Sequence, residues 1–361
     1  MTSIDFKTAR SLRSGRCEVL AEAGQCMEGS VERAVQMTRD AAFAGAWGIK
    51  TQMLKPETIA IENAPKYWED DLGTHSQREA FAAAGLIDFD KWRPVREAAR
   101  ESQIAFVSTP FDLDAVEHLE ALDVDAYKIA SGDLLWRDML DMLIDTRRPL
   151  FISTGAAWAD EIESTVEYAL DRDPSLRYRL VLLACSLVYP TPAHEANVGR
   201  VVRLRELVAE RAWGSVKVGY SDHTESAHTA LIAGAAGAVL VEKHYTFAGA
   251  QGAVADHGMA VDAEGLAKTV NNARRGAASY GDASLIPTER EERARQGARR
   301  ALYLQRDVRA GDLVESDDVL PLRPCPPNAL PLDVWHDSRG DTRWRSSRKR
   351  GDFVRMSDLD L

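Results

Sequence analysis

The sequence predicts an α/β protein that consists of a (β/α)8 TIM barrel followed by a small all-β domain. Short apolar runs alternate with helix-like segments from Cys17 onward, which is the pattern of β–α units around a parallel sheet. About eight such runs are present, and eight is the number that a closed barrel needs. After roughly Ile286 the pattern changes to a charged segment and then to short strands with Gly and Pro turns, which predicts the second domain.

The expected strands are short and apolar, and most of them end in polar residues. They cover residues 18–25, 46–52, 104–110, 126–131, 150–155, 180–186, 216–222 and 238–246. Helix-like segments lie between them, such as residues 30–45, where Ser30 is a plausible N-cap. The longest insertion follows the second strand and carries Tyr67 and Trp68. Long loops of this kind usually cover a site, so we expect it at the active-site end of the barrel.

We expect the barrel domain to span residues 1–285, a linker to span 286–297 and the second domain to span 298–361. The second domain contains an internal sequence repeat, because residues 306–319 resemble residues 347–359. Two copies of one β-turn-β unit imply a compact, pseudo-symmetric all-β domain. The matched positions are Gly311, Asp312, Val314 and Asp318 in the first copy and Gly351, Asp352, Val354 and Asp358 in the second.

The composition fits an enzyme that acts on small metabolites. The chain has 361 residues, of which 45% are hydrophobic, enough for one barrel-sized core and a small second domain. A formal net charge of −11 argues against a nonspecific nucleic-acid surface, because affinity for phosphate backbones comes from clustered cations. We therefore interpret the basic run at residues 343–350 as a solvated face.

The sequence also bears on the compartment. Residues 1–16 are polar and lack the apolar core of a signal peptide, and no run reaches transmembrane length. We therefore expect a cytoplasmic protein with no membrane partner. The cysteines form neither a C-x-x-C pair nor a zinc spacing, so reduced thiols are expected at Cys17, Cys26, Cys185 and Cys325.

Polar side chains at the strand ends predict an active site, because barrel enzymes build their sites at the carboxyl ends of the strands. Any one of these residues could be an ordinary strand-end cap, but that explanation is strained for the whole set. The set comprises Glu22, Lys50, Gln52, Ser108, Thr109, Lys128, Ser131, Ser153, Thr154, Tyr189, Ser221, Asp222, His223, Lys243 and His244.

Two lysines and several hydroxyls in this set predict an anionic, phosphorylated substrate. Ammonium groups and hydroxyl donors complement a ligand that carries both a phosphate and a carboxylate. The tripeptides S-T-G and A-S-G are weak signals alone, because they also serve as turns between strand and helix. The residues concerned are Lys50, Lys128, Ser131, Ser153 and Ser221.

His223 and His244 end consecutive strands, so their imidazoles are expected side by side at the barrel rim. Two neutral ring nitrogens can hold a divalent metal and leave positions open for water and substrate. Two hydrogen-bonded structural histidines are about as well supported by the pattern alone. An open metal position would favour Lewis-acid polarisation of a carbonyl.

The ordered motifs resemble those of the sialic acid synthase family. They are AEAGQCMEGS, GIKTQ, FVSTPFD, DAYKIASGDL, ISTGAA, CSLVYPTP, VGYSDHT and VEKHYT followed by ADHGMAVD. Residues 298–324 resemble that family's small antifreeze-like (SAF) domain. The resemblance extends from about Glu18 over nearly the whole chain, and it is specific because the motifs fall in order on separate strands.

The resemblance implies a role for each matching residue. Phosphoenolpyruvate would be held by Lys50, Thr109, Lys128, Ser131, Ser153 and Ser221. The metal, Mn²⁺ or Mg²⁺, would be held by His223 and His244, which with Glu22 form the expected catalytic group. Glu22 would orient or activate groups while water adds. The sugar would be contacted by Gln52, Asp133, Tyr189, Asp256 and Arg323.

The resemblance also implies a domain-swapped homodimer, in which Arg323 crosses from the small domain of one subunit into the partner's barrel. Two positions depart from the family pattern. Leu187 stands where the family usually has a polar residue, and Asp133 stands where many relatives have Glu. Both positions touch the pocket, so the departures bear on the acceptor sugar.

The implied reaction is that of a transferase. Phosphoenolpyruvate would condense with an open-chain, N-acetylmannosamine-like amino sugar to give a nonulosonic acid and phosphate, through metal-assisted C–C bond formation and C–O cleavage. A different modified sugar acceptor is the main alternative. A Schiff-base aldolase using Lys128 or Lys243 would leave the hydroxyls and histidines without a purpose. A non-enzymatic carbohydrate- or ice-binding protein would make the polar rim accidental.

Overall fold

The computed structural model of the chain describes residues 12, 15–247, 249–250, 254–282, 284–338 and 342–360. It divides into two compact units, Met1–Gly281 and Asp282–Leu361. Helix α11 (Glu289–Ala298) occupies most of the segment that the sequence predicts as a linker. All four cysteines are free.

The first unit is a closed barrel of eight parallel strands, and this confirms the predicted fold class. The strands are β1 (Glu18–Glu22), β2 (Gly48–Met53), β3 (Ala105–Pro110), β4 (Ala126–Ile129), β5 (Leu150–Ser153), β6 (Leu180–Cys185), β7 (Lys217–Asp222) and β8 (Leu240–His244). The barrel closes because β1 pairs with β8 as well as with β2. This closing register places Glu22 between Lys50 and His244.

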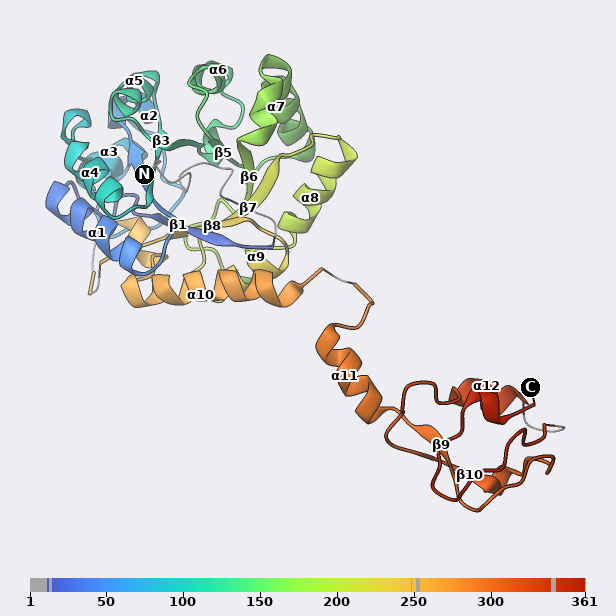
Figure 1. The fold of residues 1–361 in the computed structure, drawn as a ribbon. Helices are drawn as coiled ribbons and strands as arrows, with labels where there is room; N and C mark the ends of the chain where they lie inside the picture. Colours follow the sequence, from blue (N-terminus) through green and yellow to red (C-terminus); the bar gives the residue numbers. More distant parts are fainter. Residues whose placement is uncertain are drawn as a thin grey trace. The chain divides into compact units, whose positions relative to one another are not determined.

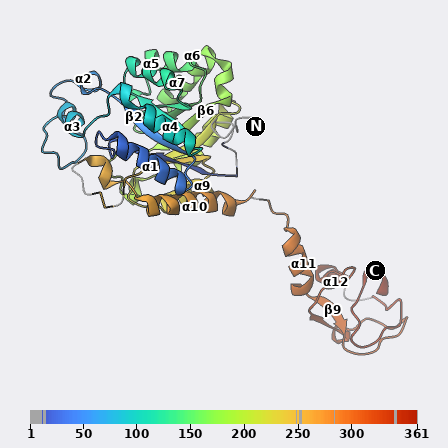
Figure 2. The ribbon, with the colours of Figure 1, turned by 60° about the vertical axis from the view of Figure 1, so that its left-hand side comes forward.

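Helices surround the strands in the order that the alternating pattern predicts (Figure 1). They are α1 (Val31–Phe43), α4 (Arg93–Glu101), α5 (Leu113–Ala121), α6 (Arg137–Asp145), α7 (Ala159–Arg172), α8 (Arg200–Glu210), α9 (Thr229–Ala235) and α10 (Ala263–Tyr280). The predicted insertion carries the short helices α2 (Pro56–Ile59) and α3 (Gln77–Ala83) between β2 and β3. Figure 2 shows this connection projecting from the barrel.

Two apolar layers stabilise the barrel. The inner layer fills the interior with side chains such as Leu20, Val107, Phe151 and Leu240. The outer layer packs the other face of the same strands against the helices. Successive side chains of a strand point to opposite faces, so each strand contributes alternate residues to each layer.

The second unit contains an antiparallel pair, β9 (Ala301–Leu304) and β10 (Val319–Leu322), and a short helix, α12 (Leu332–Ser338). Equivalent residues of the two sequence repeats form equivalent backbone hydrogen bonds. Gly311 N donates to Trp344 O over 2.7 Å, and Gly351 N donates to Leu304 O over 2.9 Å. Val308 and Arg348 exchange a pair of backbone hydrogen bonds of 3.0 Å each. The two copies are therefore related by a pseudo-two-fold axis. The resemblance to an SAF domain stays a prediction.

Among the described residues, no helix is both long enough and apolar enough to cross a membrane.

Candidate active site

Strand alternation decides which strand-end residues face the barrel interior. Leu20 and Val107 lie in the inner apolar layer, so Glu22 and Thr109, two residues further along, face the same interior. These interior polar residues are between 0% and 4% exposed. They are Glu22, Lys50, Thr109, Lys128, Ser153, Ser221, Glu242 and His244. Seven of the predicted site residues, together with Glu242, are therefore gathered at one buried end of the barrel.

Lys50 stands at the centre of one half of this group. Its Nζ lies 2.5 Å from Glu22 Oε2 and donates to Thr109 Oγ1 over 3.2 Å. Gln52 Nε2 donates to Glu22 Oε1 over 2.9 Å, so both oxygens of the Glu22 carboxyl have a neighbour. Burial raises the pKa of Glu22, and the opposing charge of Lys50 does not cancel the rise. This carboxyl can therefore hold a proton more readily than an exposed one.

Glu242 stands at the centre of the other half, and the sequence analysis did not single it out. Lys128 Nζ lies 3.2 Å from Glu242 Oε2, Ser221 Oγ donates to Oε1 over 3.0 Å, and Lys50 Nζ lies 3.8 Å from Oε1. Burial alone would raise the pKa of Glu242, but the Lys128 and Lys50 charges lower it to about 2. Glu242 lies two residues before His244 on β8, so alternation could have placed it in the interior.

Hydroxyl groups at the same end are available to a ligand. Ser153 Oγ is buried and has no hydrogen-bond partner. Ser131 comes from the 3-10 turn after β4, and its Oγ accepts from Gly155 N over 3.0 Å. Buried polar groups are nearly always hydrogen-bonded, so the unpartnered Ser153 hydroxyl indicates a place for a polar ligand or water.

The two histidines meet at the rim, as the sequence predicts. The ring centroids of His223 and His244 are 5.3 Å apart. His223 Nδ1 lies 2.6 Å from the carbonyl oxygen of Ser186, which fixes the proton on Nδ1 and leaves the Nε2 lone pair free. His244 Nδ1 is buried without a hydrogen-bond partner and lies 3.7 Å from Asp256 Oδ2. Burial, reinforced by the neighbouring positive charges, lowers the pKa of His244 well below its usual value.

Two imidazoles beside a carboxylate are a donor set that suits a borderline or hard divalent cation, and the raised pKa of His223, which its contacts with Cys185 and the Ser186 carbonyl oxygen cause against the effect of burial, means that a cation would have to displace a proton there. The unpartnered buried His244 Nδ1 and the tautomer fixed at His223 are both features that a bound metal would explain. The residues present therefore fit the metal that the resemblance implies.

An acidic and aromatic rim lies outside the lysine pair. The Tyr189 ring stacks on His223 at 4.3 Å, and Tyr67 lies 6.3 Å from Tyr189 between centroids. Burial, followed by the charges of Asp256 and Asp133, raises the pKa of Tyr67. The inserted loop thus reaches from β2 to the segment after β6. Burial raises the pKa of Asp133 to about 6.

Gly24 allows the loop after β1 to approach Asp256. Its φ is +45°, and a Cβ there would lie 2.1 Å from Asp256 Oδ2. Asp256 Oδ2 also accepts from Gln25 N over 2.8 Å. A side chain at position 24 would therefore displace the carboxylate beside His244.

Several other residues that the sequence analysis names lie outside this group of interior polar side chains. Lys243 and Asp222 face outward and form a fully buried ion pair of 3.3 Å between the barrel wall and the helices. Lys243 therefore does not line the active-site end of the barrel interior. Ser108 also faces outward and bonds with Thr51. Leu187 is half-buried after β6. Arg323 is exposed on the second unit, and its expected position in a partner's barrel stays a prediction.

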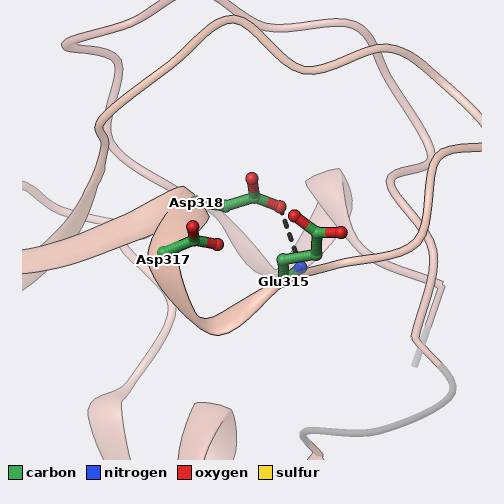
Figure 3. Close-up of side chains that lie close together, drawn as sticks. All are labelled: Glu315, Asp317 and Asp318. Atoms are coloured by element: carbon green, nitrogen blue, oxygen red, sulfur yellow. Dashed lines mark hydrogen bonds between the residues drawn. The ribbon is translucent and has the colours of Figure 1, made fainter.

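A second group of acidic side chains lies in the small unit, where ligand atoms of Glu315, Asp317 and Asp318 are all within 4.8 Å of one another (Figure 3). The Asp318 carboxylate already has hydrogen-bond partners within the protein, because it accepts from Glu315 N over 2.9 Å and from Trp344 Nε1 over 3.1 Å. In the second copy of the repeat, Arg355 N donates to Asp358 Oδ2 over the same 2.9 Å. We interpret this group as a turn cap that both copies use.

Comparisons with known proteins agree on one family. The NeuB family model matches residues 37–284. The chain is 28% identical to the N,N'-diacetyllegionaminic acid synthase of Campylobacter jejuni, over 85% of this chain and 90% of that protein. It is 26% identical to the N-acetylneuraminate-9-phosphate synthase of Mus musculus, over 76% of this chain and 74% of the relative. The crystal structure of an N-acetylneuraminic acid synthetase from Leptospira borgpetersenii matches with a TM-score of 0.66 and 28% identity, over 77% of this chain and 90% of that one.

Proposed function

Because the chain belongs to the NeuB family, we propose that this enzyme condenses phosphoenolpyruvate with the aldehyde of an open-chain amino sugar. The products are a nonulosonic acid and inorganic phosphate. Phosphoenolpyruvate is a cytoplasmic metabolite, so the proposal places the enzyme in the cytoplasm. The observation that carries the proposal is the buried arrangement of Lys50 and Lys128 on either side of Glu242, with the unpartnered Ser153 hydroxyl at the same end.

This arrangement suits a substrate with two anionic groups. Lys50 and Lys128 supply two ammonium groups in a site with little water, where charge-assisted hydrogen bonds are strong. Glu242 stabilises the charged form of both lysines while the site is empty, and the hydroxyls of Thr109, Ser131 and Ser153 add further donors. Ser221 would have to exchange its hydrogen bond to Glu242 for one to the ligand. Phosphoenolpyruvate carries a carboxylate and a phosphate on the same carbon, C2, so it can bind both lysines at once.

His223 and His244 would hold the divalent cation, manganese or magnesium, next to the Asp256 carboxylate. The bound cation would supply Lewis-acid polarisation of the sugar carbonyl.

Glu22 is the residue that we assign to proton movement. C3 of phosphoenolpyruvate bonds to the aldehyde carbon, and the aldehyde oxygen gains a proton. Water then adds to C2 and loses a proton, which leaves a hydroxyl and the phosphate on C2. The C2–O bond to phosphate then breaks while the C2 hydroxyl becomes the keto group and passes its proton to the departing phosphate. A protonated Glu22 can give the first proton and take back the second, because its raised pKa allows both forms near neutral pH. Gln52 and Lys50 hold its carboxyl in one orientation.

The rim supports an uncharged acceptor such as N-acetylmannosamine. Asp133 and Asp256 are both acidic, and burial raises the pKa of each, so a phosphorylated sugar would add a negative charge to a site that already disfavours it. The mouse relative is named for a product that carries a phosphate, and the Campylobacter relative is named for one that does not. Leu187, which stands where the family resemblance expects a polar residue, is half-buried directly after β6, so another modified amino sugar is the alternative acceptor.

A Schiff-base aldolase is the rival reaction, and one observation favours it. Burial lowers the pKa of Lys128, which would help it act as a nucleophile. The Glu242 carboxylate 3.2 Å away opposes this by stabilising the ammonium form. Trapping of a lysine adduct with borohydride, or full activity in excess chelator, would favour the aldolase.

We also propose that the active site is completed in a domain-swapped homodimer by Arg323 of the partner subunit. Large apolar side chains on the loops after four barrel strands, between 41% and 77% exposed, support a partner at this end. They are Ile61, Leu135, Trp158 and Val188. These loops all follow carboxyl ends of strands and so share one end of the barrel.

The experiment that tests the proposal is a phosphate-release screen. Purified protein, phosphoenolpyruvate and Mn²⁺ are incubated with a panel of amino sugars and with the 6-phosphate of each. Release that requires an unphosphorylated amino sugar is the expected result. Release that requires a 6-phosphate would change the acceptor class, and no sugar-dependent release would reject the synthase.

A further inference from the structure

Asp222 and Lys243 form an ion pair, and each of them directly precedes one of the two histidines in the sequence. Asp222 is the last residue of β7 and directly precedes His223, and Lys243 precedes His244 on β8. The two residues are register partners, both side chains are 0% exposed, and Lys243 Nζ lies 3.3 Å from Asp222 Oδ2. Because strand side chains alternate, the ion pair lies on the outer face of the barrel wall while His244 faces the interior.

Lys243 also holds the backbone on the far side of His223. Its Nζ donates to the carbonyl oxygen of Thr224, and Thr224 N donates to Asp222 Oδ1 over 2.9 Å. Thr224 Oγ1 lies 2.9 Å from Thr229 Oγ1, at the first residue of α9. The residues immediately before and after His223 are therefore tied to one ammonium group, and that group belongs to the strand that carries His244.

Stability alone does not account for a buried ion pair at this place. The preceding outward residues of the same two strands, Tyr220 and Val241, belong to the apolar layer against the helices. Replacing a buried ion pair by uncharged residues of similar size is often neutral or stabilising, because burial of two charges costs solvation free energy. On these two strands, a charged pair that follows apolar outward-facing residues therefore points to a requirement for fixed geometry.

We propose that Asp222 and Lys243 are positioning residues, which hold the His223 and His244 rings at the separation that a divalent cation requires. The inference rests on the proposed metal-binding role of the two histidines. Residues that orient the ligands of a metal without touching it commonly change its affinity by about 10- to 100-fold when they are replaced. Lys243 is thereby assigned to the metal site from behind the barrel wall, where it cannot form an imine with a substrate.

The test measures Mn²⁺ affinity of the full-length protein directly, by electron paramagnetic resonance of the free ion, with no substrate present. The variant Lys243→Met leaves the Asp222 charge buried without its partner, so it could fail to fold. The double variant Asp222→Asn with Lys243→Met removes both charges and keeps an acceptor for Thr224 N. Its thermal midpoint is expected close to that of the wild type, with Mn²⁺ binding about 10- to 100-fold weaker.

The matched control is the double variant Arg96→Met with Asp125→Asn. This pair, 3.1 Å apart and largely buried, lies at the opposite end of the barrel, where Asp125 also accepts from Phe106 N. Its removal is expected to leave Mn²⁺ affinity unchanged. Wild-type Mn²⁺ affinity in a folded Asp222→Asn, Lys243→Met variant would overturn the positioning role alone. A wild-type protein that binds no Mn²⁺ would overturn the proposed metal site and this inference with it.

Discussion

The ammonium of Lys50 lies 2.5 Å from the carboxyl of Glu22, and both side chains are almost completely buried. This contact joins the residue that would anchor phosphoenolpyruvate to the residue that would move protons. When an anionic ligand binds the Lys50 ammonium, Glu22 loses its stabilising partner, and the proton affinity of its carboxyl rises further. Substrate binding and protonation of Glu22 are therefore expected to be coupled.

Replacement of Lys50 by Met is expected to raise the KM for phosphoenolpyruvate by about 10- to 100-fold, the loss of one or two charge-assisted hydrogen bonds. The KM for the sugar should change much less. Steady-state kinetics with each substrate varied in turn measures both values. Lys268→Met is the control, because Lys268 forms only an exposed pair with Glu264 on α10. Equal changes in both KM values would contradict the assignment of Lys50.

The variant Glu22→Gln keeps the size of the side chain and removes its ability to exchange a proton. Its kcat is expected to fall by about 10²- to 10⁴-fold, which is the usual contribution of a positioned acid or base. Binding of phosphoenolpyruvate, measured by calorimetry in the absence of sugar, should remain within a few-fold of the wild type. A variant that keeps normal kcat would remove Glu22 from the mechanism.

His223→Ala and His244→Ala are each expected to lower turnover at least about 100-fold, because loss of one proposed ligand would weaken the binding of a cation that would supply several kcal/mol to the reaction. Both variants should also bind Mn²⁺ more weakly. His228→Ala is a suitable control, since His228 is exposed and contacts Ser226. Full turnover of either rim variant in excess chelator would contradict the metal site.

Asp133 is expected to make stability depend on pH. Burial raises the pKa of its carboxyl to about 6, above its value in the unfolded chain, so the folded state holds this proton more tightly. The folded state should therefore lose stability as pH rises from about 4 to about 6, by on the order of 1 kcal/mol after allowance for partial exposure. Urea unfolding of the wild type and Asp133→Asn between these pH values measures it. The advantage of the variant should grow with pH and level off above about 6. A difference that is independent of pH would show that Asp133 titrates normally.

Mixing of two inactive proteins tests the domain-swapped dimer. Arg323→Ala supplies an intact barrel, and His223→Ala supplies an intact Arg323. Partial recovery of activity after subunit exchange is expected if the arginine acts across the interface. A chain that ends at residue 285 and turns over normally as a monomer would contradict this arrangement.

Much of the fold could be predicted because alternation of apolar runs with helical segments is a local signal. All eight strands lie in the predicted runs, with a one-residue extension at Met53. The internal repeat in the second domain is also a local sequence signal, since Gly311 and Gly351 occupy equivalent turns in the two copies.

The site was predicted less completely, for physical reasons. Glu242 was missed because a carboxylate between two lysines looks unfavourable for an anion site until its pairing with Lys128 and Ser221 is seen. Lys243 is adjacent to His244 on β8, so strand alternation places the two side chains on opposite faces, and proximity to the strand end alone does not distinguish these faces. The proposed position of Arg323 would depend on a second subunit, so neither the strand pattern nor the contacts within one chain bear on it.

The most direct test of the central claim is the fate of oxygen during turnover in H₂¹⁸O with phosphoenolpyruvate, Mn²⁺ and the amino sugar that the screen identifies. Because water adds at C2 and the C–O bond breaks, the account predicts sugar-dependent release of phosphate that contains no ¹⁸O, together with an equal amount of nonulosonic acid. ³¹P spectroscopy resolves the labelled and unlabelled phosphate. Phosphate that carries ¹⁸O, or that appears at the same rate without the sugar, would contradict the account.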